Sequence, residues 1–576
     1  MYDVNLKKMK KIVLFICALS LIGCIATSPK EKLDKLISSY ETFQENAEEE
    51  NPLGVYTETR FEAYARFCDS LKTEVEKIDP KTLDDDTRIS HTLLHFVLNE
   101  TIVKFKFKTH WNPILSDAGF HSSLTYQVRP ITNKKSALSY LKLLKAIPEH
   151  IEQQKILIKK GLDAGMGQPL VIFKGYESTY EQHITETAEE NFYYAPFLDL
   201  PSQLSSNEKD SLRLAAKEVV LNKVIPTFQS VKTFFEETYY PNTRKSIGVS
   251  ETPNGEAYYQ SRIDYYTTLD MTPKSIHEKG LEEVARIKQQ MEAIIKEVKF
   301  KGSLTAFITF LRTDPQFYAK TPEELLKHAR NIAKKLDEQL PRYFITLPRK
   351  PYGVAPVPAS IAPKYTGGRY VGTSPESTDP GYYWVNTYNL PSRPLYVIPS
   401  LTAHEAVPGH HLQGALNSEL PQSIPNFRRN LYLSAYGEGW GLYTEFLADD
   451  MGIYTTPYEH FGKLTYEMWR ACRLVVDTGI HAFGWSREEA VDFMAKNTAL
   501  SLHEVNTEID RYISWPGQAL SYKIGEIKIR ELREKAEKEL GGNFDIREFH
   551  EIILEKGTVT LSLLEERINN YIQAKK

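Results

Sequence analysis

The segment from His404 to His411 reads HEAVPGHH and combines the residue types of a hydrolytic metal site. Imidazole nitrogens bind zinc, and a carboxylate beside them can take a proton from an attacking water molecule. Glu405 directly follows His404 and is therefore the candidate general base. The usual HExxH spacing puts both histidines on one face of a helix, but here Pro408 stands four residues after His404.

Pro408 and Gly409 decide which histidine can join His404 at a metal. On a regular helix His410 would lie about 120° away from His404 around the axis, and His411 about 10 Å further along it. The proline ring clashes with the carbonyl four residues earlier and cannot donate to it, and glycine permits backbone angles that other residues resist. We therefore expect a kinked or widened turn that brings His410 beside His404, with His411 as a pocket residue.

The segment 436–445, YGEGWGLYTE, contains a candidate third ligand. Hydrolytic zinc sites with two histidines and one glutamate leave a further position for water. Glu438 fits this role because it stands among glycine, tryptophan and tyrosine rather than among other charges. Glu445 follows one heptad later on the same helix face and could orient a ligand histidine. This donor set favours one Zn²⁺ per chain over manganese or cobalt.

Two later segments contain further candidate site residues. Asp477 and His481 are four residues apart, a spacing that allows a hydrogen bond on one helix face. Such a pair would let His481 stabilise the oxyanion of a tetrahedral intermediate; the alternative is a purely structural pair. Tyr522 is a second candidate oxyanion donor, and Arg511 or Lys523 could hold a substrate carboxylate. The alternative for these three residues is a turn with aromatic packing.

The elements that must position these residues are mostly helices. Apolar residues recur at helical spacing within 31–105 and 135–165. Thr272-Pro273 begins a further helix, and the segments that start at Thr321 and Ser486 have the pattern of capping boxes. The chain is therefore predicted to be mainly α.

Between about 345 and 400 proline, glycine and tyrosine accumulate, and 382–387 predicts a strand that contains Asn386. This strand lies just before the His404 segment, so it could be an edge strand that pairs with an extended peptide and puts Asn386 near the substrate. The alternative is an ordinary small sheet that packs the helices. Either way, we expect a small mixed β-sheet before the metal-binding helix.

Four blocks occur in a fixed order, HEAVPGHH, GEGWGLYTE, RLVVDTGIHAFGW and WPGQALSYKIG, and together they resemble the bacterial family called domain of unknown function 885. The resemblance covers nearly all of the chain after the N-terminal signal. It implies a mainly helical, cleft-forming fold similar to zinc peptidases of the gluzincin type, with 31–576 as one catalytic domain or two lobes around a cleft. It also implies His404, His410 and Glu438 as metal ligands and Glu405 as general base.

The N-terminus has the pattern of a secretory signal peptide. Lysines precede the apolar run 12–21, as in a secretory signal, and Leu21-Ile22-Gly23-Cys24 resembles a bacterial lipobox. The resemblance implies a signal peptide at 1–23, lipidation of Cys24, a tether at 24–30 and an anchored position in the cell envelope, with the outer membrane or periplasmic face favoured. The alternative is a plain cleaved signal with an incidental cysteine.

Composition excludes some classes of function. The chain has 576 residues and a net charge of −4, so nothing indicates nucleic acid binding. Of the four cysteines, only Cys68 and Cys472 lie in the region predicted to fold, which allows one disulfide.

The sequence therefore predicts zinc-dependent hydrolysis of peptide bonds in short peptides by a lipid-anchored envelope protein. One alternative is a metal-dependent hydrolase of a non-peptide amide or ester. Another is a non-catalytic lipoprotein that binds peptides.

Overall fold

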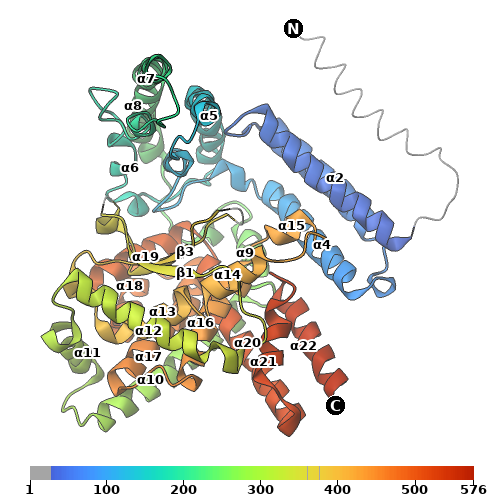
Figure 1. The fold of residues 1–576 in the computed structure, drawn as a ribbon, viewed down its shortest axis with the longest axis vertical. Coiled ribbons are helices and arrows are strands. Elements are labelled where there is room, and N and C mark those ends of the chain that lie inside the picture. The colour runs from blue at the N-terminus through green and yellow to red at the C-terminus, as the bar shows by residue number, and fades with distance from the viewer. Residues whose placement is uncertain (1–27, 360, 375–376) are drawn as a thin grey trace.

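The computed structural model describes residues 28–359, 361–374 and 377–576. The predicted signal peptide and Cys24 lie outside these residues. Helices make up most of the described chain, as expected, with one small mixed sheet (Figure 1). The strands are β1 Tyr352–Pro356, β2 Gly368–Val371 and β3 Gly381–Val385. The helices are α2 Pro29–Glu50, α3 Glu58–Val75, α4 Asp85–Lys106, α5 Lys134–Asp163, α6 Ser178–Glu181, α7 Ser206–Val219, α8 Ile225–Thr233, α9 Gly255–Thr267, α10 Pro273–Glu297, α11 Leu304–Thr313, α12 Pro322–Tyr343, α13 Ile398–Glu405, α14 His410–Ser418, α15 Asn426–Arg429, α16 Ser434–Asp450, α17 Pro457–Ala482, α18 Arg487–Asn497, α19 Leu502–Ser514, α20 Ser521–Leu540, α21 Ile546–Leu554 and α22 Leu561–Lys575.

Capping residues begin several helices where the sequence indicated. Ser486 forms a reciprocal capping box with Glu489, and Thr272 caps α10. Thr321 caps α12 through the backbone amide of Glu324, but the Glu324 side chain accepts from the Lys320 amide instead of completing a box. Helix α2 begins directly after Ser28, inside the last part of the predicted tether.

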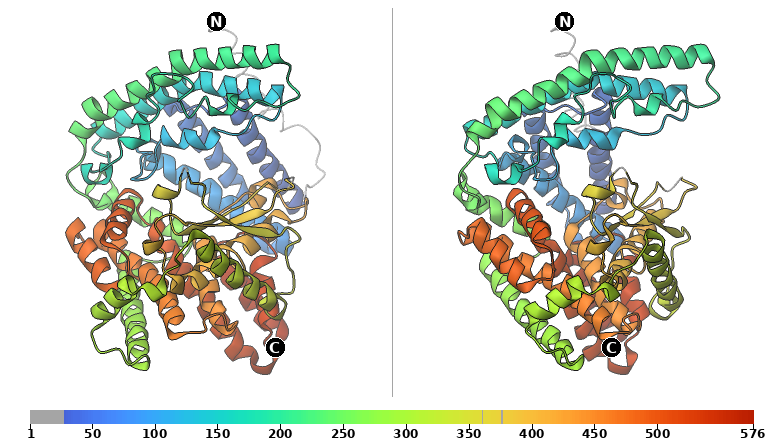
Figure 2. Two further views of the ribbon diagram at one scale, coloured as in Figure 1. Left: turned by 60° about the vertical axis from the view of Figure 1, so that its left-hand side comes forward. Right: turned by 90° about the vertical axis from the view of Figure 1, so that its left-hand side faces the viewer.

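Most helices belong to a layer or to the body below it, and α2, α3 and α4 pack around an apolar cluster of their own. Helices α5 to α8 form a layer at the top of the molecule, and the sheet with α9 to α22 lies in the body below (Figures 1 and 2). Helix α17 contributes Val476 to the apolar cluster shared with the top layer, and Leu474 to the cluster beneath the sheet. This central helix therefore joins the two largest groups of buried apolar residues among those described. Within the same residues, none of the helices has the length and apolar character needed to span a membrane.

The sheet has the order β1-β3-β2, with β1 parallel and β2 antiparallel to β3. The strand predicted at 382–387 corresponds to β3, which spans Gly381–Val385, so Asn386 lies just beyond its end and not within the strand. β3 is the central strand, and both of its edges are paired. The expectation that it is an edge strand was therefore wrong. The two strands that pair with β3 are formed by residues 352–356 and 368–371. The sequence of β3 itself does not predict these partners. Strand β2 instead forms an edge of the sheet.

The two cysteines within the described chain are both buried free thiols, Cys68 in α3 and Cys472 in α17. The disulfide that the sequence allowed is therefore not formed. The two side chains belong to different apolar clusters of the described chain, which separates them.

Candidate metal centre

The HEAVPGHH segment forms two helices rather than one kinked helix. Helix α13 ends at Glu405 and α14 begins at His410, with a cis peptide bond between Val407 and Pro408 in the connection. A Cβ atom on Gly409 would lie 1.9 Å from the carbonyl oxygen of His404, so only glycine fits there. The helix break brings His410 beside His404, with their ring centroids 4.7 Å apart.

Helix α16 holds this connection from the other side. The indole Nε1 of Trp440 donates to the carbonyl of Pro408 at 2.9 Å, and Thr444 Oγ1 donates to the carbonyl of Ala403 at 3.0 Å. A Cβ atom on Gly441 would lie 2.7 Å from the ring of His404, so the glycine lets this ring approach the helix. The GEGWGLYTE segment thus supports the histidines as well as supplying acidic side chains.

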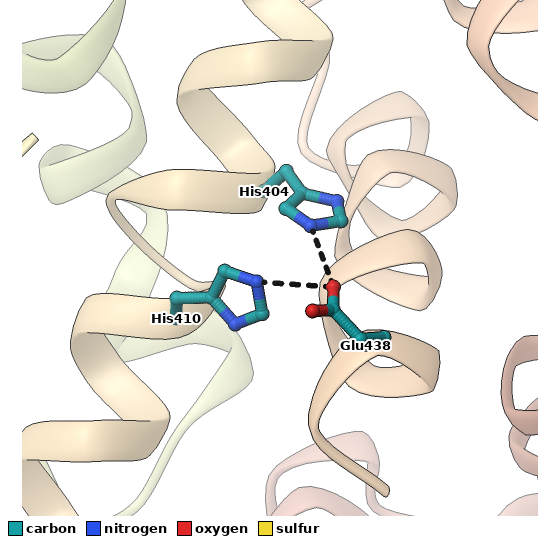
Figure 3. A group of neighbouring side chains, drawn as sticks. All are labelled: His404, His410 and Glu438. Atoms are coloured by element: carbon teal, nitrogen blue, oxygen red, sulfur yellow. Dashed lines mark ion pairs between the residues drawn. The ribbon is translucent and has the colours of Figure 1, made fainter. Parts of the chain in front are cut away.

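His404, His410 and Glu438 point toward one another (Figure 3). Glu438 Oε2 lies 3.5 Å from His404 Nε2 and 3.4 Å from His410 Nε2. Two ligand atoms that are each about 2.1 Å from a tetrahedral zinc ion are about 3.4 Å apart. One donor atom from each residue lies within 4.8 Å of the others. These three residues therefore form a candidate metal-binding triad whose donor set and spacing fit zinc.

The charges around the triad also fit a cation. His404 is 3% exposed and Glu405 is 9% exposed. Burial disfavours a charged imidazole, but hydrogen bonds to Glu438 and Glu445 and the charge of Glu405 raise the pKa of His404 to about 9. Burial also opposes ionisation of Glu438, yet its bonds to His404 and His410 hold the pKa of this carboxyl well below its usual range. The carboxylates of Glu405, Glu438 and Glu445 thus surround the two histidines. A divalent cation bound at the histidines would balance their negative charge.

Glu445 lies behind His404, on the side away from Glu438. Its Oε1 is 2.8 Å from His404 Nδ1, and Arg470 Nη2 lies 3.8 Å from the same oxygen. A carboxylate at Nδ1 favours the tautomer in which Nδ1 carries the proton and Nε2 is free to bind a metal.

Glu405 is held by strand β2. Its Oε2 accepts a hydrogen bond from the backbone amide of Tyr370 at 2.8 Å. The Tyr370 hydroxyl lies 3.1 Å from Nδ1 of His411, and burial lowers the pKa of this histidine to about 4. His411 therefore contacts the sheet and is not part of the triad. Sequence reasoning missed Tyr370 because it precedes Glu405 by 35 residues and belongs to no motif.

Tyr432 is a second residue that sequence reasoning missed. Its hydroxyl donates to Glu438 Oε1 at 3.2 Å, which leaves Oε2 to face the two histidines. Desolvation and the charge of Glu438 raise the pKa of Tyr432 well above its usual range, so the phenol stays a donor. Helical spacing does not predict this contact, because Tyr432 lies before the first residue of α16 and the chain there is not helical.

Asp477 and His481 do not form the pair that their spacing suggested. Asp477 accepts from the Tyr259 hydroxyl at 2.6 Å and from the Gly517 amide at 3.2 Å. His481 accepts from the Val249 amide at Nδ1, and its Nε2 lies 2.9 Å from the carbonyl of Tyr512. Both ring nitrogens of this fully buried histidine are thus engaged by backbone groups. This geometry corrects the oxyanion role considered for His481, because no N–H is left to reach a substrate.

Two further candidates are also engaged elsewhere. Lys523 is fully buried, and its ammonium lies within 2.9 Å of the carboxylates of Glu283, Glu467 and Glu526. It cannot hold a substrate carboxylate while three protein carboxylates surround it. Asn386 is also fully buried. Its side-chain amide donates to three backbone carbonyls of the turn before β2, so it shapes this turn instead of facing a substrate; the acceptors are Ala362, Tyr365 and Thr366.

Tyr522 and Arg511 differ in what engages their polar groups. Tyr522 lies in α20, and the guanidinium of Arg473 stacks 4.4 Å from the centre of its ring. Arg511 donates to Gln518 at 2.7 Å and lies 3.5 Å from Glu508. The guanidinium of Arg511 is thus already paired, whereas the Tyr522 hydroxyl has no hydrogen bond to any residue of the described chain.

Comparison with known proteins gives a family and a fold. The family model described as "Bacterial protein of unknown function (DUF885)" matches residues 41–568. A solved structure described as "the putative lipoprotein from Colwellia psychrerythraea" has 29% identity and a TM-score of 0.84, over 91% of this chain and 92% of that chain. A second, "a putative lipoprotein of unknown function from Shewanella oneidensis", has 17% identity and a TM-score of 0.70, over 94% and 99%. No curated protein matches the chain.

Proposed function

Because the chain belongs to the bacterial family DUF885, whose function is unknown, we propose its function from the site itself: metal-dependent hydrolysis of peptide bonds. His404, His410 and Glu438 would hold the ion, and the preferred ion is Zn²⁺. The observation that carries this proposal is the pair of distances from Glu438 Oε2 to the two histidine nitrogens, 3.5 and 3.4 Å. They match the separation of ligands around a tetrahedral zinc ion.

A bound zinc ion would polarise the scissile carbonyl and lower the pKa of a water molecule that attacks it. Glu405 would accept the proton of this water. The amide of Tyr370 holds Oε2 of Glu405 at 2.8 Å, so the proton would go to Oε1. Protonated Glu405 would then pass the proton to the leaving nitrogen. The peptide bond is then hydrolysed, and the products are a carboxylate and an amine. Tyr522 is the remaining candidate donor to the oxyanion.

The substrate would be a short peptide that reaches the triad beside strand β2. His410 and Glu438 are only partly buried, which supports access from solvent on this side. We further propose that residues 31–576 act as one catalytic domain around a cleft, carried on the outside of the inner membrane by a lipid on Cys24. The similarity to the structure described as "the putative lipoprotein from Colwellia psychrerythraea" supports the anchor.

The test combines metal analysis with a peptide-library digest that is read by mass spectrometry. We expect about one zinc ion per chain and cleavage of short peptides. Glu405→Gln should keep the metal but lower kcat by about 10²- to 10⁴-fold, the usual contribution of a general base. An amide and ester panel run beside the library separates the alternative hydrolase. Protein that binds peptides and metal but cleaves nothing in either panel would contradict an enzymatic role.

A further inference from the structure

Arg369 is an exposed cation without a carboxylate partner. No acidic group of the described chain lies within ion-pair distance of its guanidinium, whereas the arginines of α17 and α19 near the site each have one. Arg470 lies beside Glu445, and both Arg473 and Arg511 lie beside Glu508. Arg369 is thus the cation in this neighbourhood whose planar donors are not already paired with a protein carboxylate.

The position of Arg369 places it at the candidate metal centre. It stands in edge strand β2 directly before Tyr370, whose amide binds the carboxylate of Glu405. Side chains alternate along a strand, so Arg369 lies on the face opposite to Tyr370. Across the sheet it pairs with Trp384, whose ring lies 6.0 Å from that of Tyr365. Arg369 therefore stands on an aromatic surface at the edge of the sheet.

The charges of the centre act on Arg369. Partial desolvation opposes its charge, but Tyr365, Glu405 and Glu438 act on it electrostatically and raise its pKa above the ordinary value. The guanidinium is therefore permanently charged and lies within electrostatic reach of both the candidate base and a candidate ligand, without pairing with either. A divalent cation at the triad would balance the carboxylates there, and Arg369 would then be free to bind another anion.

We propose that Arg369 binds a carboxylate group of the peptide substrate, so that the enzyme selects peptides with a carboxylate near the scissile bond. The inference rests on the proposed peptidase function and names its substrate class. A guanidinium presents two parallel N–H donors that match a carboxylate, and such charge-assisted pairs orient a ligand as well as hold it. The carboxylate can be the C-terminus of the peptide or an acidic side chain.

Three probes distinguish these sources: acetyl-tetraalanine as the free acid, the same peptide as the C-terminal amide, and an amide with aspartate as the last residue. Binding is measured by calorimetry on metal-loaded Glu405→Gln, which should cleave the probes about 10²- to 10⁴-fold more slowly, and on the same protein with Arg369→Gln added. We expect Arg369→Gln to weaken binding of the free acid about 10- to 100-fold and to leave the amide nearly unchanged. Arg369→Lys should lie between, because it keeps the charge and loses the paired donors.

Arg547→Gln in α21 is the matched control, since it removes another exposed arginine that has no ion pair to the described residues. It should change binding of none of the probes. If the aspartyl amide alone depends on Arg369, an acidic side chain is the ligand; if the free acid alone does, the C-terminus is. Equal binding of all three probes to the Arg369-containing protein, or an equal loss for all three in Arg369→Gln, overturns the inference. Absence of cleavage in the library digest instead counts against the peptidase function and leaves this binding result to stand on its own.

Discussion

At the scale of single residues, the ring of His404 is held from two sides. Glu445 lies 2.8 Å from Nδ1, and Glu438 lies 3.5 Å from Nε2. The first contact selects the tautomer and the second completes the set of donors. His410 has no such carboxylate at its second nitrogen among the described residues, so the helix break before it must supply its orientation.

Replacement of the two neighbouring histidines should therefore separate their roles. His410→Ala should lose most of the bound metal, because it removes one of three donors. His411→Ala should keep it, because His411 contacts Tyr370 and not the triad. Metal content of both purified variants by atomic emission checks this. Full occupancy in His410→Ala with loss in His411→Ala would show that the assignment across the Pro408–Gly409 connection is wrong.

Tyr432 should tune the metal site through Glu438. Its hydroxyl holds Oε1 at 3.2 Å, so Tyr432→Phe frees this oxygen and loosens the orientation of Oε2. We expect metal affinity to fall about 10- to 100-fold, the usual effect of removing a group that orients a ligand. Chelator competition measures this affinity, and Tyr388→Phe, another exposed tyrosine, is the control. Unchanged affinity in Tyr432→Phe would mean that the bond does not position Glu438.

At the scale of elements, α17 connects several parts of the fold through hydrogen bonds of its buried polar side chains. Its Asp477 and His481 hold Tyr259, Gly517 and the backbone at Val249 and Tyr512, which connects α17 to α9 and to the turn before α20. The DTGIH pattern is thus explained by packing between elements. Its polar residues satisfy buried backbone groups that would otherwise cost stability.

Asp477 should make the stability of the fold depend on pH. Burial raises the pKa of its carboxyl to about 7, although bonds from Tyr259 and Gly517 oppose the shift. The folded state therefore binds a proton that the unfolded state releases above about pH 4. The stabilisation of the folded state by protonated Asp477 is fully present below about pH 4, and it is lost as the pH rises to about 7.

Asp477→Asn should remove this dependence, because its side-chain oxygen can still accept both hydrogen bonds. The free energy of unfolding of the variant should rise relative to wild type by about 1.4 kcal/mol per pH unit between about pH 4 and 7. Chemical denaturation at several pH values measures the difference. A constant difference across this range would contradict the protonated state of Asp477.

At the scale of the whole molecule, the N-terminal anchor decides where the protein works. We predict that Cys24→Ala releases otherwise active protein into the soluble envelope fraction or leaves it unprocessed, because the acyl chains of a lipoprotein provide the membrane affinity. Cell fractionation combined with acyl labelling measures this. Unlabelled wild-type protein recovered from the cytosol would contradict the lipobox interpretation.

The sequence by itself determined the helical class, many helix starts and the identity of the triad. Capping residues and helical periodicity act within a few residues, so Ser486 and Thr272 could be interpreted without any tertiary contact. The triad residues could be named because metal donors are a property of side-chain type, and HEAVPGHH and GEGWGLYTE keep them within two short segments.

Only the tertiary structure decided which polar residues are free and which are already paired. Lys523 and His481 have the chemistry of site residues, yet distant carboxylates and backbone groups engage them. Conversely, Tyr370, Tyr432 and Arg369 belong to no motif and meet the centre only because β2 and the chain before α16 pack against it. The burial and pairing of a polar side chain depend on residues from distant parts of the chain. The local sequence around that side chain therefore does not predict them.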